Sequence, residues 1–161
     1  MAQKSIGLIK LLNDFKKKSM LEIQLIDSDI KVPTKAHKGD AGWDLYTKEL
    51  KTLHMGEIYA FPLGFRIIGK PGMMYKVEDK SGLALKGLHC MGGVIDNNYR
   101  GECHAIVQNM NMHPIDINVH TKIAQLVVQY VSDDDHLIIN TSEVVEETSR
   151  GSNGFGSTGL T

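Results

Sequence analysis

Residues 92–102 read GGVIDNNYRGE, and this stretch combines a strand, a turn and one acid. Its Val-Ile pair favours a pleated, half-buried strand, its Asn-Asn pair is typical of a turn, and Gly101 permits a bulge or a close backbone approach. The stretch therefore predicts a β-hairpin with Asp96 at its tip. There, Asp96 is either a positioned general base or a side chain that hydrogen-bonds the turn backbone.

Working outward, the composition is that of one ordinary globular domain. The chain has 161 residues, of which 42% are hydrophobic and 23% are charged, and this length suits a single sizeable core. The net charge of −1 provides no basic field for nucleic acid, so we expect no nucleic-acid partner. Any anionic ligand must then be bound by local groups.

Neither end of the chain contains an apolar run long enough to cross a bilayer. We therefore expect no membrane partner and a soluble protein that is cytoplasmic or otherwise intracellular. The only two cysteines, Cys90 and Cys103, are too few for a disulfide framework and fit a reducing compartment. Each has a histidine neighbour, but successive strand residues point to opposite faces, so we expect free thiols, buried or half-buried, in preference to a zinc site.

Short alternating or β-branched runs dominate the chain from Leu21 onward. Leu21 to Leu25 alternates with a period of two, and the stretches 56–68 and 106–131 supply further runs divided by Gly, Pro and Asn. This pattern predicts an all-β, jelly-roll-like sandwich or barrel. One short helix is expected near Ser81 to Lys86, where good helix formers follow one another.

The two ends of the chain differ from this β-rich part. Residues 1–19 form an N-terminal extension with apolar side chains at helical spacing, which suits an amphipathic helix, a frayed extension or a targeting segment. Residues 20–147 are expected to form the β-domain. Residues 148–161 are rich in glycine and read either as a solubilising tail or as an arm that grips an anion and covers a ring.

Three more segments combine charged, polar and apolar residues. Asp44 in AGWDL is a turn acid or a site acid, and Ser81 in KSGLA is a plain N-cap or part of a phosphate site at a helix start. Gln125 in KIAQL is an edge-strand side chain facing water or an amide of the site.

Taken in order, five segments resemble the five motifs of the trimeric deoxyuridine triphosphatase (dUTP diphosphatase) family. They are AGWDL, KSGLA, GGVIDNNYRGE, KIAQL and RGSNGFGSTG, and their order and approximate spacing match the family over residues 21–161. The third and fifth together are specific. Residues 1–19 lie outside the resemblance.

The resemblance implies a jelly-roll-like β-fold assembled as a homotrimer, with each active site built from three subunits. It implies hydrolysis of dUTP to dUMP and pyrophosphate by attack of water on the α-phosphorus, which limits uracil incorporation into DNA and supplies dUMP for dTMP synthesis. Asp96 matches the general base, and Tyr99 matches the ring under the deoxyribose. Four further positions match the segment that reads the uracil edge: Gly93, Val94, Ile95 and His104.

The remaining matched positions face the phosphates or cover the base in the implied complex. They are Lys80, Ser81, Gly82 and Gln125 for the phosphates, Arg150, Ser157 and Thr158 for a clamp on the γ-phosphate, and Phe155 with Gly156 for stacking on uracil. Asp44 matches the acid that helps to place a water of the Mg²⁺ shell, while the ion itself is held mainly by the triphosphate.

Four positions or groups depart from the family pattern. Asp79-Lys80 replaces Pro-Arg, Asn98 replaces a second acid, residues 120–122 replace Gly-Asp-Arg, and Asn153 replaces a glycine. Because lysine lacks a planar bidentate guanidinium, the Asp79-Lys80 departure leaves open a protein that binds nucleotide with reduced catalysis and serves as a regulatory interaction protein, and the shared fold leaves open deamination of dCTP.

Overall fold

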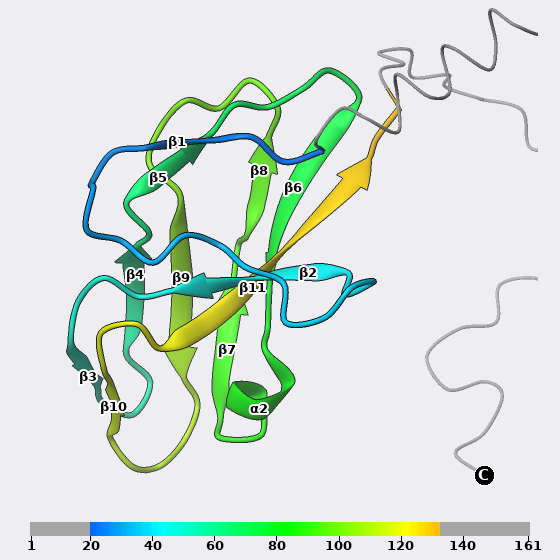
Figure 1. Cartoon of the computed structure of the whole chain (residues 1–161). Coiled ribbons are helices and arrows are strands. Elements are labelled where there is room, and N and C mark those ends of the chain that lie inside the picture. Colours follow the sequence, from blue (N-terminus) through cyan, green and yellow to red (C-terminus); the bar gives the residue numbers. More distant parts are fainter. Residues whose placement is uncertain (1–19, 133–161) are drawn as a thin grey trace, which may run out of the picture.

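The computed structural model describes residues 20–132 and is built almost entirely from strands, as the alternating pattern predicts (Figure 1). The elements, in chain order, are β1 Ile23–Leu25, β2 Gly42–Tyr46, β3 Lys51–Leu53, β4 Ile58–Pro62, β5 Phe65–Ile67, β6 Met73–Glu78, α2 Ser81–Ala84, β7 Leu88–Met91, β8 Val94–Asp96, β9 His104–Asn109, β10 Ile115–Ile117 and β11 Lys122–Tyr130. The predicted all-β fold with one short helix is confirmed for this part of the chain.

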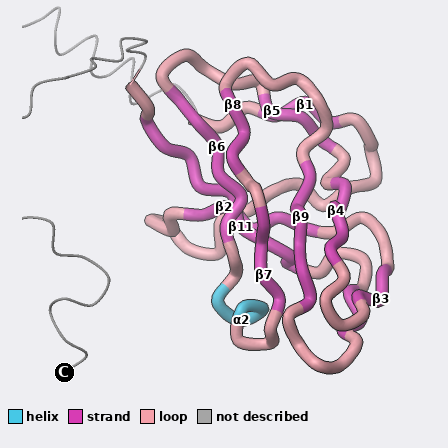
Figure 2. Tube along the Cα trace, turned by 180° about the vertical axis from the view of Figure 1, so that it is seen from behind, coloured by secondary structure: helices cyan, strands magenta, loops and turns pink. Residues whose placement is uncertain are grey.

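Two sheets carry the fold. A four-stranded sheet has the order β2-β11-β6-β8, and a three-stranded sheet has the order β4-β9-β7. Two-stranded ladders, β1 with β5 and β3 with β10, lie at opposite ends of the molecule (Figures 1 and 2). All the ladders are antiparallel, so each strand can bury one face and leave the other exposed.

The core follows from period-two alternation. In β6, Met73, Tyr75 and Val77 are buried, while the residues between them are half-buried. In β9, Ala105, Val107 and Asn109 are buried, and His104 and Ile106 are exposed. Large apolar side chains fill the space between the sheets, among them Leu45, Phe61, Phe65, Ile123 and Leu126.

The short helix ends earlier than expected. Its last turn is tightened by hydrogen bonds from Lys86 N to Leu83 O (2.9 Å) and from Gly87 N to Ala84 O (2.9 Å). Gly87 then takes a φ of 80° and leads into β7. The alternative that Ser81 is the N-cap is wrong, because Lys80 occupies that position and Ser81 is the first helical residue.

The predicted hairpin around Asp96 is also different in the structure. Gly92 and Gly93 take φ values of 68° and 89°, which turn the chain out of β7 so that β8 pairs with β6. The strand that follows, β9, pairs instead with β4 and β7 in the other sheet. Asp96 therefore ends a strand, as expected, but the two arms of the turn belong to different sheets.

Three expectations concern residues outside the described part of the chain. They are the helix within residues 1–19, the last part of the predicted β-domain, 133–147, and the arm 148–161, with Arg150, Phe155, Gly156, Ser157 and Thr158. Between residues 20 and 132 no helix is long and apolar enough to cross a membrane. Cys90 is a half-buried free thiol and Cys103 a buried one, as predicted. Burial is the main cause that raises the pKa of Cys90 to about 12 and that of Cys103 to about 11.

Candidate functional site

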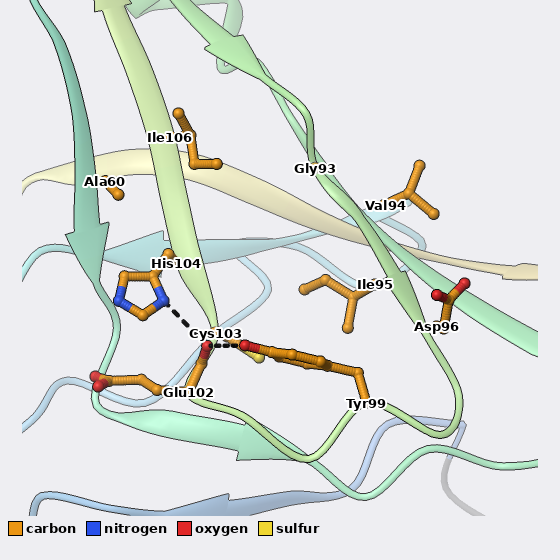
Figure 3. Close-up of a pocket in the computed structure, with 10 residues that line it drawn as sticks. All are labelled: Ala60, Gly93, Val94, Ile95, Asp96, Tyr99, Glu102, Cys103, His104 and Ile106. Carbon is orange, nitrogen blue, oxygen red and sulfur yellow. Dashed lines mark hydrogen bonds between the residues drawn. The ribbon is translucent and has the colours of Figure 1, made fainter.

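A pocket of about 390 Å³ lies between β8 and β9, where the two sheets separate (Figure 3). This volume is in the range of small-molecule sites. Its lining combines apolar side chains with a few polar groups: Ala60, Gly93, Val94, Ile95, Asp96, Tyr99, Glu102, Cys103, His104 and Ile106. Six of these ten were predicted as site residues, namely Gly93, Val94, Ile95, Asp96, Tyr99 and His104.

The short strand β8 presents both faces at this pocket. Ile95 points inward toward Tyr99 and His104, whereas Val94 and Asp96 extend from the opposite face of the strand (Figure 3). Ile95 is accordingly half-buried, and both of its strand neighbours are exposed. The Asp96 carboxylate thus stands at the rim, where it can reach a ligand without filling the pocket.

Among residues 20–132, no group forms a hydrogen bond or ion pair with the Asp96 carboxylate. The turn that follows it is closed by the main chain instead, through a hydrogen bond from Tyr99 N to Asp96 O (3.1 Å). Hence the alternative that the carboxylate caps the turn is wrong. A carboxylate that the fold does not use is available to accept a proton.

The Tyr99 ring lies flat along one wall because of the glycine two residues later. A Cβ at position 101 would stand 2.2 Å from the Tyr99 hydroxyl oxygen and 2.4 Å from Cζ, so only glycine allows the ring to fold back. The hydroxyl then donates to Glu102 O (3.2 Å), and the same carbonyl oxygen lies 3.0 Å from His104 Nδ1. Gly101 was expected to allow a bulge or a close approach of the backbone, and in the structure it is the Tyr99 side chain that lies close to it.

Glu102 holds the part of the pocket wall formed by Tyr99 and His104. Its Oε1 atom accepts hydrogen bonds from Gly64 N (2.8 Å) and from Lys48 Nζ (3.2 Å). Lys48 also forms an ion pair with Asp27 (2.5 Å), so two segments contact this carboxylate directly and a third is linked to it through Lys48. Both Glu102 contacts are partly buried, which favours a fixed position for the carbonyl that receives Tyr99 and His104.

A second cluster forms around Asp44 on β2. Its side chain is 9% exposed, and its two oxygens pair with Lys80 and with Lys122, the latter at 2.7 Å. Burial acts to raise the pKa of Asp44, but hydrogen bonds from Lys122 and Lys80 outweigh it and hold the pKa below its ordinary value. Two ammonium groups thus share one carboxylate beside the start of α2.

The segment leading into α2 is held from two sides. Gln125 Nε2 donates to Asp79 O (2.8 Å), while the Asp79 carboxylate accepts a hydrogen bond from Cys90 N (2.5 Å) and lies 2.8 Å from His89 Nδ1. Burial acts to raise the pKa of Asp79, yet the Cys90 and His89 contacts lower it overall. Side-chain bonds therefore fix a position where the family pattern has proline.

The structure sorts the predicted residues into two groups with β6 between them. Asp44, Lys80, Ser81, Gly82 and Gln125 lie around α2 and β11, and the other six line the pocket beside β8. Gln125 pairs with Asp44 on one side and Glu78 on the other, so the edge-strand alternative for it is wrong.

Sequence reasoning did not select Glu102 or Lys122 as site residues, although both stood in segments already singled out. Asp79 was noticed only as a departure from a pattern. The partners of Glu102 and Lys122, such as Gly64 and Asp44, lie more than 30 positions away in the chain, and no local motif indicates them. The Asp79 carboxylate contacts Cys90 N and His89 across the helix that separates them in the chain.

Comparison with known proteins places these features in a family. The dUTPase family model matches residues 28–159. The deoxyuridine 5'-triphosphate nucleotidohydrolase of Corynebacterium diphtheriae is 39% identical over 152 residues, covering 92% of this chain and 98% of that protein. The enzyme of the same name from Clostridioides difficile is 38% identical over 147 residues, covering 87% and 98%.

Solved structures show the same fold. A dUTPase of Staphylococcus bacteriophage 80alpha, solved with dUpNHpp, has a TM-score of 0.78 at 22% identity and covers 89% of this chain and 100% of its own. A mutant dUTPase from phage phi11 of S. aureus, described with a structural Mg(II) ion, has a TM-score of 0.71 at 20% identity, covering 78% and 100%. The family model spans most of the chain, and the bacterial relatives match over nearly their whole length. This chain belongs to the dUTPase family.

Proposed function

We propose that this protein hydrolyses dUTP to dUMP and pyrophosphate, with Asp96 as the general base. The observation that carries the proposal is a carboxylate without a partner among the described residues, at the rim of a pocket of about 390 Å³, in a chain of the dUTPase family. By this reaction the protein limits uracil incorporation into DNA and supplies dUMP for dTMP synthesis.

In the proposed step, the Asp96 carboxylate takes a proton from a water molecule as the water oxygen bonds to the α-phosphorus. The bond between that phosphorus and the α,β-bridging oxygen breaks, and the electron pair leaves with pyrophosphate. Cleavage of a phosphoanhydride depends on positioning and charge neutralisation more than on covalent catalysis. One well-placed base is therefore sufficient.

The pocket wall suits a deoxyuridine. The exposed Tyr99 ring would pack under the deoxyribose and leave no room for a 2′-hydroxyl group. Peptide groups of Gly93, Val94 and Ile95, with the strand that begins at His104, would read the uracil edge, because fixed main-chain donors and acceptors discriminate uracil from cytosine. The narrow space between the two strands would exclude the thymine methyl group.

The α2 region suits the phosphates. Lys80, Ser81, Gly82 and Gln125 surround the helix start, and the shared lysine pair at Asp44 keeps ammonium groups beside it. The C-terminal arm would complete the site with Arg150, Ser157 and Thr158 on the γ-phosphate and Phe155 with Gly156 over the uracil ring. These arm residues are proposed from the sequence resemblance alone.

Mg²⁺ is the proposed cofactor, and it would neutralise charge on the phosphates. The described residues contain no cluster of three or more His, Cys, Asp or Glu side chains that would bind an ion directly, so the donor set fits an ion held by the triphosphate. Asp44 uses each carboxylate oxygen for one lysine, and each oxygen keeps a lone pair that can accept a hydrogen bond from a water of the ion.

A homotrimer with shared sites accounts for the division of the predicted residues into two groups. Within one chain, β6 separates the Asp96 pocket from the α2 cluster. A pocket of one subunit and an α2 cluster of another would together meet both ends of the substrate.

The test is a substrate panel on the full chain. The purified protein is incubated with dUTP, dCTP, dTTP and UTP in Mg²⁺, and pyrophosphate, ammonia and bound nucleotide are measured. We expect pyrophosphate from dUTP alone. Ammonia from dCTP would assign a deaminase instead, and tight dUTP binding without turnover would assign a binding protein.

A further inference from the structure

A glycine outside all five family-like segments touches the turn that carries Asp96. Gly69 lies between β5 and β6, and a Cβ at this position would stand 2.1 Å from Asn97 O, 2.6 Å from its Cα and 2.7 Å from its carbonyl carbon. Contacts below 3.0 Å are essentially never made by real Cβ atoms. The opposing atoms are main chain, so they cannot rotate away as a side chain would.

Space alone requires glycine here, since Gly69 does not take a positive φ. The residues around it are held in place. Ile68 N donates to Glu22 O (2.9 Å), and Lys70 N donates to the Tyr75 hydroxyl oxygen (3.3 Å). Tyr75 is fully buried in β6. The Gly69 side of the contact is therefore anchored to the buried Tyr75, and a larger residue there would push against the turn.

A displacement of Asn97 would also move Asp96 and Tyr99, which belong to the same turn. Asn97 O accepts a hydrogen bond from Arg100 Nη1 (2.7 Å), and Arg100 also donates to Tyr99 O (2.9 Å). Asp96 precedes Asn97, and its carbonyl receives Tyr99 N. The proposed base, Asp96, and the ring proposed to pack under the deoxyribose, Tyr99, thus lie on one small turn, and Gly69 packs against the outside of that turn.

We propose that Gly69 is a positioning residue that sets where the Asp96 carboxylate stands, and that its lack of a side chain is needed for full turnover. The proposal rests on the proposed role of Asp96. To reach ordinary van der Waals distance from the new Cβ, the turn would have to move away by about 1 Å. A misplacement of that size costs on the order of 10²-fold in rate.

The test compares Gly69→Ala with Gly56→Ala in the full chain. Gly56 lies before β4 at the other end of the molecule, with a φ of 75° and open space around its Cβ position, so alanine there strains the backbone without pushing on any atom. For both variants kcat, KM for dUTP, thermal unfolding and backbone amide chemical shifts are measured. We expect kcat to fall about 10²-fold for Gly69→Ala with shifts at Asn97, Asn98 and Tyr99. Gly56→Ala should lose stability and keep its kcat.

Wild-type kcat and unchanged amide shifts in Gly69→Ala would overturn the proposal. If that variant does not fold, Arg100→Ala serves instead, because the exposed Arg100 side chain supports the same turn. Arg100→Ala should shift the same amide resonances and lower kcat by a smaller factor. Wild-type kcat and wild-type amide shifts in Arg100→Ala would overturn the proposal. Asp96→Asn is assayed in parallel. Full activity of Asp96→Asn would refute the proposed base, whereas an inactive Asp96→Asn beside a fully active Gly69→Ala would refute only the positioning role.

Discussion

The Asp96 turn and the Asp44 cluster are held in place by different physical means. At the turn, the shape comes mainly from the main chain, through the hydrogen bond from Tyr99 N to Asp96 O and the close contacts at Gly69 and Gly93, and Arg100 adds donors to two main-chain carbonyls. At the cluster, the shape comes from ion pairs and hydrogen bonds among long side chains, with Lys80 and Lys122 on Asp44 and Gln125 on the Asp79 carbonyl.

This difference suits two tasks. The position of a base must be correct to within about 0.5 Å for it to hydrogen-bond the water that it activates, and a glycine-shaped main chain has little freedom to drift. Binding of the phosphates depends more on positive charge than on an exact shape. Lysine carries its charge on a flexible side chain, so its ammonium group can move from the Asp44 carboxylate to a phosphate. Substitutions at the turn should therefore affect kcat and selectivity, and substitutions at the cluster should affect KM.

The largest effect is expected for Asp96→Asn. Loss of the base should lower kcat about 10²- to 10⁴-fold while dUTP still binds. Single-turnover kinetics and equilibrium dUTP binding measure the two quantities. Asp116→Asn is a matched control, because Asp116 pairs with Thr52 (2.6 Å) in the β3–β10 ladder, away from the pocket. Wild-type turnover in Asp96→Asn would remove the base from the mechanism.

A smaller effect, on selectivity, is expected for Tyr99→Ala. Without the ring, the ratio of kcat/KM for UTP to that for dUTP should rise about ten- to a hundredfold, because a 2′-hydroxyl group would then fit. Tyr99→Phe keeps the ring and loses only the bond to Glu102 O, so it should keep the wild-type ratio. An unchanged ratio in Tyr99→Ala would show that the ring does not select the sugar.

At the cluster, Lys80→Met and Lys122→Met should each raise KM for dUTP about tenfold and change kcat less, as expected for loss of one charge-assisted contact. The increase should shrink at high salt, which screens the remaining charges. Lys51→Met is the control, since Lys51 forms an ion pair with Glu57 (2.7 Å) away from α2. A fall in kcat at constant KM would contradict the division of tasks between the two regions.

The smallest effect is expected at His120, the one non-glycine residue between 20 and 132 with a positive φ, at 64°. His120→Gly should relieve this strain and stabilise the protein by up to about 1 kcal/mol, with kcat unchanged. Its N–H would still donate to Thr47 O (2.8 Å). Thermal unfolding measures the change, and a lower melting temperature would show that the histidine side chain contributes more than the backbone strain removes.

Sequence patterns predicted the fold class well because alternation is a short-range rule, whereas the wall residues Gly93, Val94, Ile95, Tyr99 and His104 were predicted from the resemblance to the family. The predicted runs 21–25, 56–68 and 106–131 contain β1, β4, β5, β10, β11 and most of β9, and the GGVIDNNYRGE stretch contains six of the ten residues that line the pocket. What local patterns missed were contacts set by tertiary structure. The pairing of β8 with β6, the Glu102 anchor on Gly64 and the approach of Gly69 to Asn97 all join segments that are distant in sequence.

The departures from the family pattern were visible in the sequence, but their consequences were not. Lys80 and Lys122 read separately as weak replacements for arginine. In the structure they share Asp44, so the two substitutions act as one unit. Asp79 similarly replaces a rigid proline with a carboxylate that holds Cys90 N and His89.

The central claim, that water attacks the α-phosphorus of dUTP, is tested most directly by a single turnover in H₂¹⁸O. Dilute dUTP is mixed with excess full-length protein and Mg²⁺, and the products are analysed by mass spectrometry. One ¹⁸O atom in the phosphate of dUMP, with unlabelled pyrophosphate, is the predicted result. Label in pyrophosphate and none in dUMP would contradict it.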